Sequence, residues 1–129
     1  MVRLLRIFGR ACLGAIFVSS GVDLFNDPAG RAKSAAEAIP VVPETPLLGR
    51  IHGAVMLGAG SALSVGVLPA LSAGVLAGTL VPNTYVGHAF WKVPDAAQRK
   101  PQLIHFLKNL AIAGGLLTVI ADERGRKQG

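Results

Sequence analysis

Residues 51–91 read IHGAVMLGAGSALSVGVLPALSAGVLAGTLVPNTYVGHAFW, and no Asp, Glu, Lys or Arg interrupts them. An uncharged run of this length is too long for one buried helix, but it suits two membrane spans of about 20 residues each. Near its middle, the segment Gly66-Val67-Leu68-Pro69 holds the Gly and Pro residues that often turn a chain between antiparallel helices. The run therefore predicts an integral membrane protein.

The overall composition agrees with this prediction. Hydrophobic residues make up 51% of the 129 residues, charged residues make up 16%, and the mean hydropathy is +0.51. An average soluble domain carries about 25% charged residues. The net charge of +6 does not indicate nucleic-acid binding, because the basic residues flank the apolar segments, where they anchor spans at the lipid interface. We expect a lipid bilayer, and no nucleic acid, around this chain.

Two further apolar segments, one on each side of the central run, are also long enough to cross a bilayer. The four predicted spans cover about residues 4–25, 47–67, 70–90 and 103–121. We therefore expect an all-α fold, with one four-span membrane domain over residues 1–129. Short loops would join the helices into an integral membrane four-helix bundle with both termini on the same side.

The polar segment 26–46 separates the first two predicted spans. Within it, residues 32–38 read AKSAAEA, a composition that favours a short helix on the membrane surface. A cleaved signal peptide is an alternative for the N-terminus, but no A-x-A site follows its apolar segment, so we expect a retained first span. Basic residues are nearly balanced between the two sides. Because those around the first span precede it, we expect cytoplasmic termini.

Small residues recur at every fourth position in the predicted spans, and such residues let helix backbones approach closely in lipid. These residues are Ala54, Gly58, Ala62 and Gly66 in the second span, and Ala70, Gly74 and Gly78 in the third. We expect these faces to pack inside the bundle. An alternative use for Gly74 and Gly78 is the interface of a homo-oligomer.

Common catalytic motifs are absent from the chain. Cys12 is the only cysteine, which excludes an intramolecular disulfide or a C-x-x-C redox pair. There is no H-E-x-x-H zinc motif, no phosphate-binding Gly-rich loop and no G-x-S-x-G element. The sequence therefore predicts no catalytic or metal-binding residues, and it favours a protein that is not itself an enzyme.

Polar residues do gather at those ends of the predicted spans that should lie on one membrane face. The candidate ligand- or partner-binding residues are Asp23, Arg50, His52, His88, Trp91, His105, Lys108 and Asn109. Ionisable residues within spans are costly, and they usually face the bundle interior or water. An ion pair between Lys108 and Asp23 is the simplest way to satisfy both groups.

Two interpretations of these residues stay open. In the first, they are interfacial anchors, with Lys108 reaching toward the headgroups and Trp91 in an aromatic belt. In the second, they line a polar pocket that binds a redox-active headgroup or a protein partner. A metal site built from the three histidines is conceivable, but no spacing in the sequence enforces it.

The chain resembles DoxX-family membrane proteins in three places. These are FVSSGVDLFNDP at residues 17–28, GHAFW at residues 87–91 and FLKNL at residues 106–110. The resemblance implies a small multi-pass protein of the bacterial plasma (inner) membrane with four helices. It also implies redox partners, because the family is named after a subunit associated with a thiosulfate:quinone oxidoreductase. Mycobacterial relatives are linked to a complex with a superoxide dismutase and a sulfurtransferase.

Three functions follow from the residues and the resemblance. The first is a non-catalytic membrane subunit that anchors or organises a redox or oxidative-stress complex. The second is a quinone-binding subunit of a membrane oxidoreductase, in which His88, Lys108 and Asn109 donate hydrogen bonds to the quinone oxygens. The third is a small transporter or permeability factor, which the lack of a visible inverted repeat disfavours.

Overall fold

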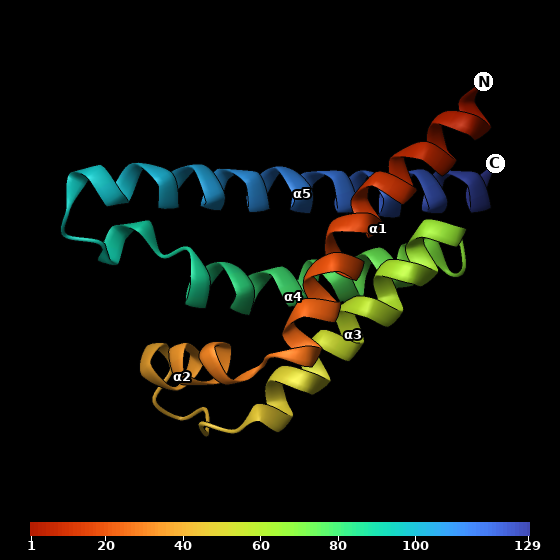
Figure 1. Ribbon diagram of the computed structural model, residues 1–129. Coiled ribbons are helices and arrows are strands. Elements are labelled where there is room, and N and C mark those ends of the chain that lie inside the picture. Colours follow the sequence, from red (N-terminus) through yellow and green to blue (C-terminus); the bar gives the residue numbers. More distant parts are fainter.

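The computed structural model describes all 129 residues, and it is entirely helical (Figure 1). The helices are α1 (Val2–Asn26), α2 (Ala29–Ala38), α3 (Pro46–Val65), α4 (Pro69–Gly87), the short 3-10 helix η1 (Phe90–Lys92) and α5 (Ala96–Gln128). The predicted all-α fold is confirmed, and so is a short helix within the polar segment 26–46. The four long helices coincide with the four predicted spans, except that α5 extends well beyond its span at both ends.

Two helices, α1 and α5, are long and apolar enough to cross a membrane by length and composition. The other two long helices, α3 and α4, are not among them, and each contains polar residues, such as His52 in α3 and Asn83 in α4. The count of four spans therefore stays a prediction.

Local sequence signals explain where the helices begin and end. The Thr45 hydroxyl accepts a hydrogen bond of 3.3 Å from the Leu47 N–H at the start of α3, and Pro46 occupies the first turn. At the other end, Gly66 has a φ of +82°, the left-handed conformation that glycine adopts without steric cost. Pro69 then begins α4. The turn predicted at residues 66–69 is thus confirmed.

Helices α1 and α3 form a close antiparallel pair through facing glycines. A Cβ atom added to Gly21 would lie 2.7 Å from the carbonyl oxygen of Gly53, and one added to Gly53 would lie 2.7 Å from that of Gly21. Two turns along, a Cβ atom on Gly14 would lie 2.5 Å from the carbonyl oxygen of Gly60. Because these obstacles are backbone atoms, the close approach of the two helices requires glycine.

The small-residue faces expected from the sequence are not the ones that pack. A Cβ atom on Gly58, Gly74 or Gly78 would meet nothing within 4 Å, so the prediction that these faces lie inside the molecule is wrong. The second predicted span contains two interleaved series of small residues. The series that holds Gly53 and Gly60 packs because it leaves bare backbone toward α1. Whether the open face of Gly74 and Gly78 contacts a second copy of the chain stays a prediction.

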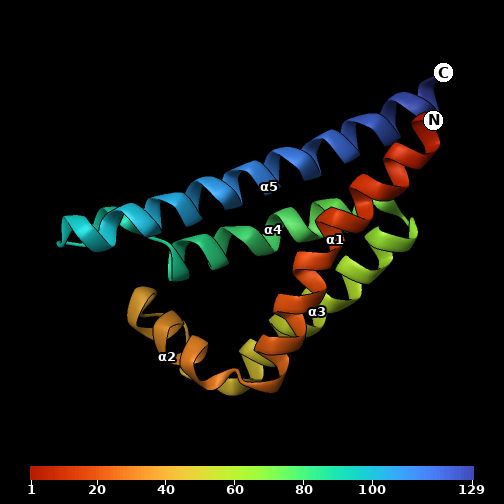
Figure 2. The same cartoon turned by 45° about the horizontal axis from the view of Figure 1, so that its top comes forward.

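The second antiparallel pair, α4 and α5, is inclined to the first (Figure 1, Figure 2). The two pairs meet at the end that holds both termini and the α3–α4 turn, and they diverge toward the other end, near α2. The molecule is therefore an open V of two helix pairs rather than an evenly packed bundle. Its core consists of Phe17, Met56, Leu63, Ala73, Leu76, Leu80 and Leu116.

Ion pairs close the end of the V where the termini lie. The Arg6 guanidinium donates to both carboxylate oxygens of Asp122, at 2.7 and 2.8 Å. Glu123 accepts from Arg126 at 2.8 Å and lies 3.5 Å from Arg10. These contacts join the start of α1 to the end of α5, as expected for termini that share a side. The sequence pattern indicates only that these arginines flank the spans, and it does not indicate their ion pairs.

Candidate functional site

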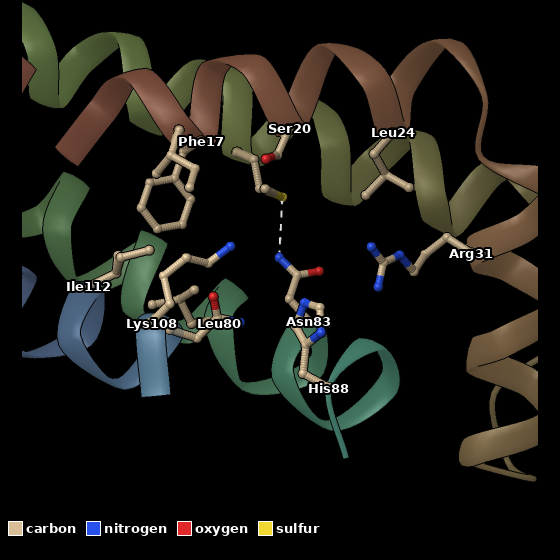
Figure 3. Close-up of a pocket in the computed structure, with 12 residues that line it drawn as sticks. Phe17, Ser20, Leu24, Arg31, Leu80, Asn83, His88, Lys108 and Ile112 are labelled. Carbon is tan, nitrogen blue, oxygen red and sulfur yellow. Dashed lines mark hydrogen bonds between the residues drawn. The ribbon is translucent and has the colours of Figure 1, made fainter. Parts of the chain in front are cut away.

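A cavity of about 120 Å³ lies between the two helix pairs, and residues from all five α-helices and from the segment after α4 line it (Figure 3). We call it the central cavity. Its apolar lining consists of Ile16, Phe17, Leu24, Met56, Leu80 and Ile112. Its polar lining consists of Ser20, Arg31, Asn83, His88, Lys108 and Asn109. The site thus combines an apolar wall with several hydrogen-bond donors, and it has no carboxylate.

Two cations reach the central cavity from different helices. Figure 3 shows the Lys108 ammonium and the Arg31 guanidinium pointing toward Asn83 from opposite sides. Neither side chain forms a salt bridge. Both residues are exposed, so the cavity is open to its surroundings. An excess of positive charge without a carboxylate favours a ligand that carries negative or carbonyl oxygens.

Gly87 makes room for one of these cations. A Cβ atom added to Gly87 would lie 2.8 Å from Nη1 of Arg31. The guanidinium therefore rests where a larger residue in α4 would place its side chain. This contact connects α2 with α4 across the mouth of the V.

Hydrogen bonds between α4, the segment that follows it and α5 hold the polar lining in position. The Asn109 amide donates a 3.0 Å hydrogen bond to the Thr84 hydroxyl, and His88 Nδ1 lies 2.9 Å from Gln102 Oε1. The His88 ring also stacks on His105, with the ring centroids 5.0 Å apart. These contacts hold the His88 and Asn109 side chains in position.

Five of the eight candidate residues gather where α4 meets α5. His88, Lys108 and Asn109 line the central cavity, and His105 supports His88. Trp91 belongs to a neighbouring aromatic cluster, in which its ring lies 5.9 Å from that of Phe106.

The remaining three candidates lie elsewhere. His52 lines a second cavity of about 160 Å³ between α2, α3 and α4, and its Nε2 atom is buried without a hydrogen-bond partner. Arg50 is exposed. Asp23 is also exposed and lines a shallow depression beside Asp27 and Arg31.

The predicted ion pair between Lys108 and Asp23 does not form. No salt bridge joins the two residues. The two helix pairs diverge toward the end of α1 that holds Asp23 (Figure 1), whereas Lys108 points into the central cavity (Figure 3). The three histidines are also not gathered in one place, and no group of three His, Cys, Asp or Glu side chains could hold a metal ion.

Sequence reasoning missed several lining residues, above all Arg31 and Asn83. Arg31 belongs to the polar segment between the first two predicted spans. A basic residue there is expected to be an ordinary anchor at the membrane interface. Asn83 did carry a signal, because an amide within an apolar segment needs a polar partner or a polar cavity. Its Nδ2 atom lies 3.5 Å from the sulfur of Met56.

Long apolar helices, outward-facing apolar side chains and a partly polar cavity between two helix pairs are features of a helical membrane protein. A family model described as DoxX matches residues 5–89, about two thirds of the chain. The chain therefore belongs to the DoxX family of membrane proteins, as the resemblance predicted. The match includes Arg31, Asn83 and His88 and ends before α5. No curated protein and no solved structure matches the chain.

Proposed function

We propose that this protein is a membrane subunit whose central cavity binds the oxygen-bearing headgroup of an apolar ligand, with a quinone as the class that fits best. The observation that carries the proposal is the pair of cations without a salt bridge, Arg31 and Lys108, in a cavity whose lining is half apolar and holds no carboxylate. A quinone ring carries two carbonyl oxygens on opposite edges. Cations that approach from opposite sides suit such a ring.

The polar and the apolar lining residues would have different roles in binding. Lys108 and Arg31 would donate charge-assisted hydrogen bonds to the carbonyl oxygens, and these bonds are about twice as strong as neutral ones. Asn109 is already bonded to Thr84, so it positions α5 against α4 more than it serves the ligand. Phe17, Leu80 and other apolar side chains would contact the ring. A bound quinone would supply electron and proton transfer.

The proposal places α1, α3, α4 and α5 across the bacterial plasma membrane as four spans of one domain, with cytoplasmic termini. The length and hydropathy of α1 and α5 support this arrangement. Large apolar side chains also point outward along these helices. Phe8, Leu71, Val81 and Leu117 are among the exposed ones. Such a surface suits lipid rather than water.

Quinone titration of the purified full-length protein tests the ligand proposal. A short-chain ubiquinone analogue is added in mild detergent, and quenching of Trp91, the only tryptophan, reports binding. Lys108→Met should weaken binding by about tenfold or more, because it removes a charge-assisted hydrogen bond. Lys100→Met is the matched control, since Lys100 is exposed on α5 and does not line the cavity. Equal affinity of the wild type and Lys108→Met would contradict the proposal.

A second candidate role is the non-catalytic subunit of a redox complex, with a superoxide dismutase, a sulfurtransferase or a quinone oxidoreductase as the kind of partner. A separate observation favours it. At the diverging end of the V, Tyr85, Phe90, Trp91 and Phe106 form an aromatic cluster, and Trp91 is 51% exposed. Tryptophan is enriched at the centres of protein interfaces. The two roles are compatible, because the cluster and the central cavity use different side chains.

A further inference from the structure

A second positively charged site lies where the two helix pairs meet, at the end with both termini. A depression of about 580 Å³ is bounded there by the start of α1, the end of α5 and the turn between α3 and α4. We call it the terminal depression. Its lining includes Arg3, Arg6, Arg10, Arg126, Glu123 and Gly66.

The charges in this depression are not balanced. Four arginines line it, and Glu123 is the one carboxylate among its lining residues. Glu123 is shared between Arg10 and Arg126, whereas Arg6 is neutralised by Asp122 from outside the lining. Arg3 has no partner. The depression therefore holds more positive charge than the chain itself neutralises.

Arg10 is built into the floor of the depression. Only 16% of its side chain is exposed, and its Nε atom is buried without a hydrogen-bond partner. Nη2 of Arg10 lies 3.2 Å from the position that a Cβ atom on Gly66 would take. The left-handed glycine thus leaves room for the guanidinium, and a buried donor without a partner is expensive unless a ligand satisfies it.

The N-terminus of α4 adds to the positive electrostatic potential of the terminal depression. Pro69, its first residue, lines the depression, and no side chain caps the helix there. The positive end of the helix dipole therefore lies beside the arginines. Guanidinium groups bind phosphate in a bidentate manner, so the chemistry that fits this site is a phosphate group.

We propose that the terminal depression binds a phosphate group, and that an anionic membrane lipid supplies it. The depression lies at the end of α1 and α5, where the predicted spans meet the headgroup region. Leu4 and Phe8 are 69% and 70% exposed on the same part of α1, where they would contact the acyl chains of a bound lipid. Free phosphate has the same chemistry but gains nothing from these apolar neighbours.

Native mass spectrometry of the full-length protein in mild detergent tests this site. Phosphatidylglycerol or phosphatidylcholine is added, and retained lipid is counted. We expect retention of phosphatidylglycerol in preference to phosphatidylcholine. Arg3→Gln should reduce that retention about fivefold, the effect of one basic residue near an anionic lipid surface. Because Arg3 is exposed and unpaired, the substitution leaves the fold intact.

Three further variants test whether the effect is specific to the terminal depression. Arg124→Gln removes the same charge from an exposed residue of α5 that does not line the depression, so it should leave retention unchanged. Arg10→Gln should reduce retention at least as much as Arg3→Gln, and Arg10→Lys should restore part of it. If Arg124→Gln and Arg3→Gln reduced the retention of phosphatidylglycerol equally, the proposal that the terminal depression is the binding site would be overturned.

A calorimetric titration with inorganic phosphate distinguishes the two sources of the phosphate group. If phosphate binds in an Arg3-dependent manner and phosphatidylglycerol shows no preference, the lipid source is overturned and the phosphate site is supported. If neither phosphatidylglycerol nor phosphate binds in an Arg3-dependent manner, the whole proposal is overturned.

Discussion

Individual side chains decide what the central cavity can bind, and only some of them were predictable. His88, Lys108 and Asn109 were predicted because ionisable or polar residues at the ends of apolar segments seek a polar neighbour. Arg31 was not, because its place depends on how α2 folds back toward α4, which no local pattern of charges encodes. The predicted Lys108–Asp23 pair failed for the same reason. Two opposite charges form an ion pair only if the fold brings their helices close together.

The ion pair of Arg6 and Asp122 leads to a prediction about how the stability of the fold depends on pH. The Arg6 guanidinium donates two hydrogen bonds to the Asp122 carboxylate and so lowers the pKa of Asp122, which lies just beyond the predicted span. A carboxyl whose pKa is lower in the folded state stabilises the fold above its unfolded pKa of about 4. This contribution is lost as the pH falls through the folded value.

We therefore expect Asp122→Asn to lower the thermal unfolding temperature slightly at pH 7 and to differ less from the wild type in acid. The effect is small because the pair is solvent-accessible. Circular dichroism melts at several pH values measure it. Glu37→Gln is the control, because Glu37 is exposed and unpaired, and it should not change the pH dependence. A constant difference between Asp122→Asn and the wild type at all pH values would contradict the assignment.

Helices were easier to predict than the faces by which they pack. Local signals such as Thr45 before Pro46, and Gly66 before Pro69, fix the ends of α3 and the start of α4 within the chain itself. Packing faces depend on partners. Gly53 and Gly58 belong to two interleaved series in one helix, and spacing alone does not tell which series meets α1.

This difference between the two glycines predicts opposite effects of the same substitution. Gly53→Ala places a Cβ atom 2.7 Å from the Gly21 carbonyl oxygen, so we expect destabilisation by about 1–3 kcal/mol. Gly58→Ala meets open space, and alanine favours helix by up to about 1 kcal/mol over glycine, so it should be neutral or stabilising. Thermal unfolding in detergent compares the two. Similar changes in both variants would show that α1 and α3 do not pack through Gly53.

At the scale of the whole molecule, the V gives its two ends different properties. The end with the termini is closed by ion pairs, and its terminal depression is strongly basic. The diverging end carries the exposed Trp91 and the first turns of α5, which begin at Ala96, before the predicted span. Apolar side chains cover much of the surface in between. We expect a partner protein to contact the diverging end, because Trp91 is exposed there.

We expect that native mass spectrometry of the protein from its own membranes detects a stoichiometric protein partner, and that Trp91→Ala loses it, because this change removes the exposed ring of the aromatic cluster. Trp91→Phe keeps an aromatic ring and should retain more of the partner. Lys108→Met changes the central cavity alone and should leave the partner bound. If Trp91→Ala retains the partner as well as the wild type does, the diverging end is not the docking surface. A protein that never carries a partner would leave ligand binding as its function and exclude the role of a complex subunit.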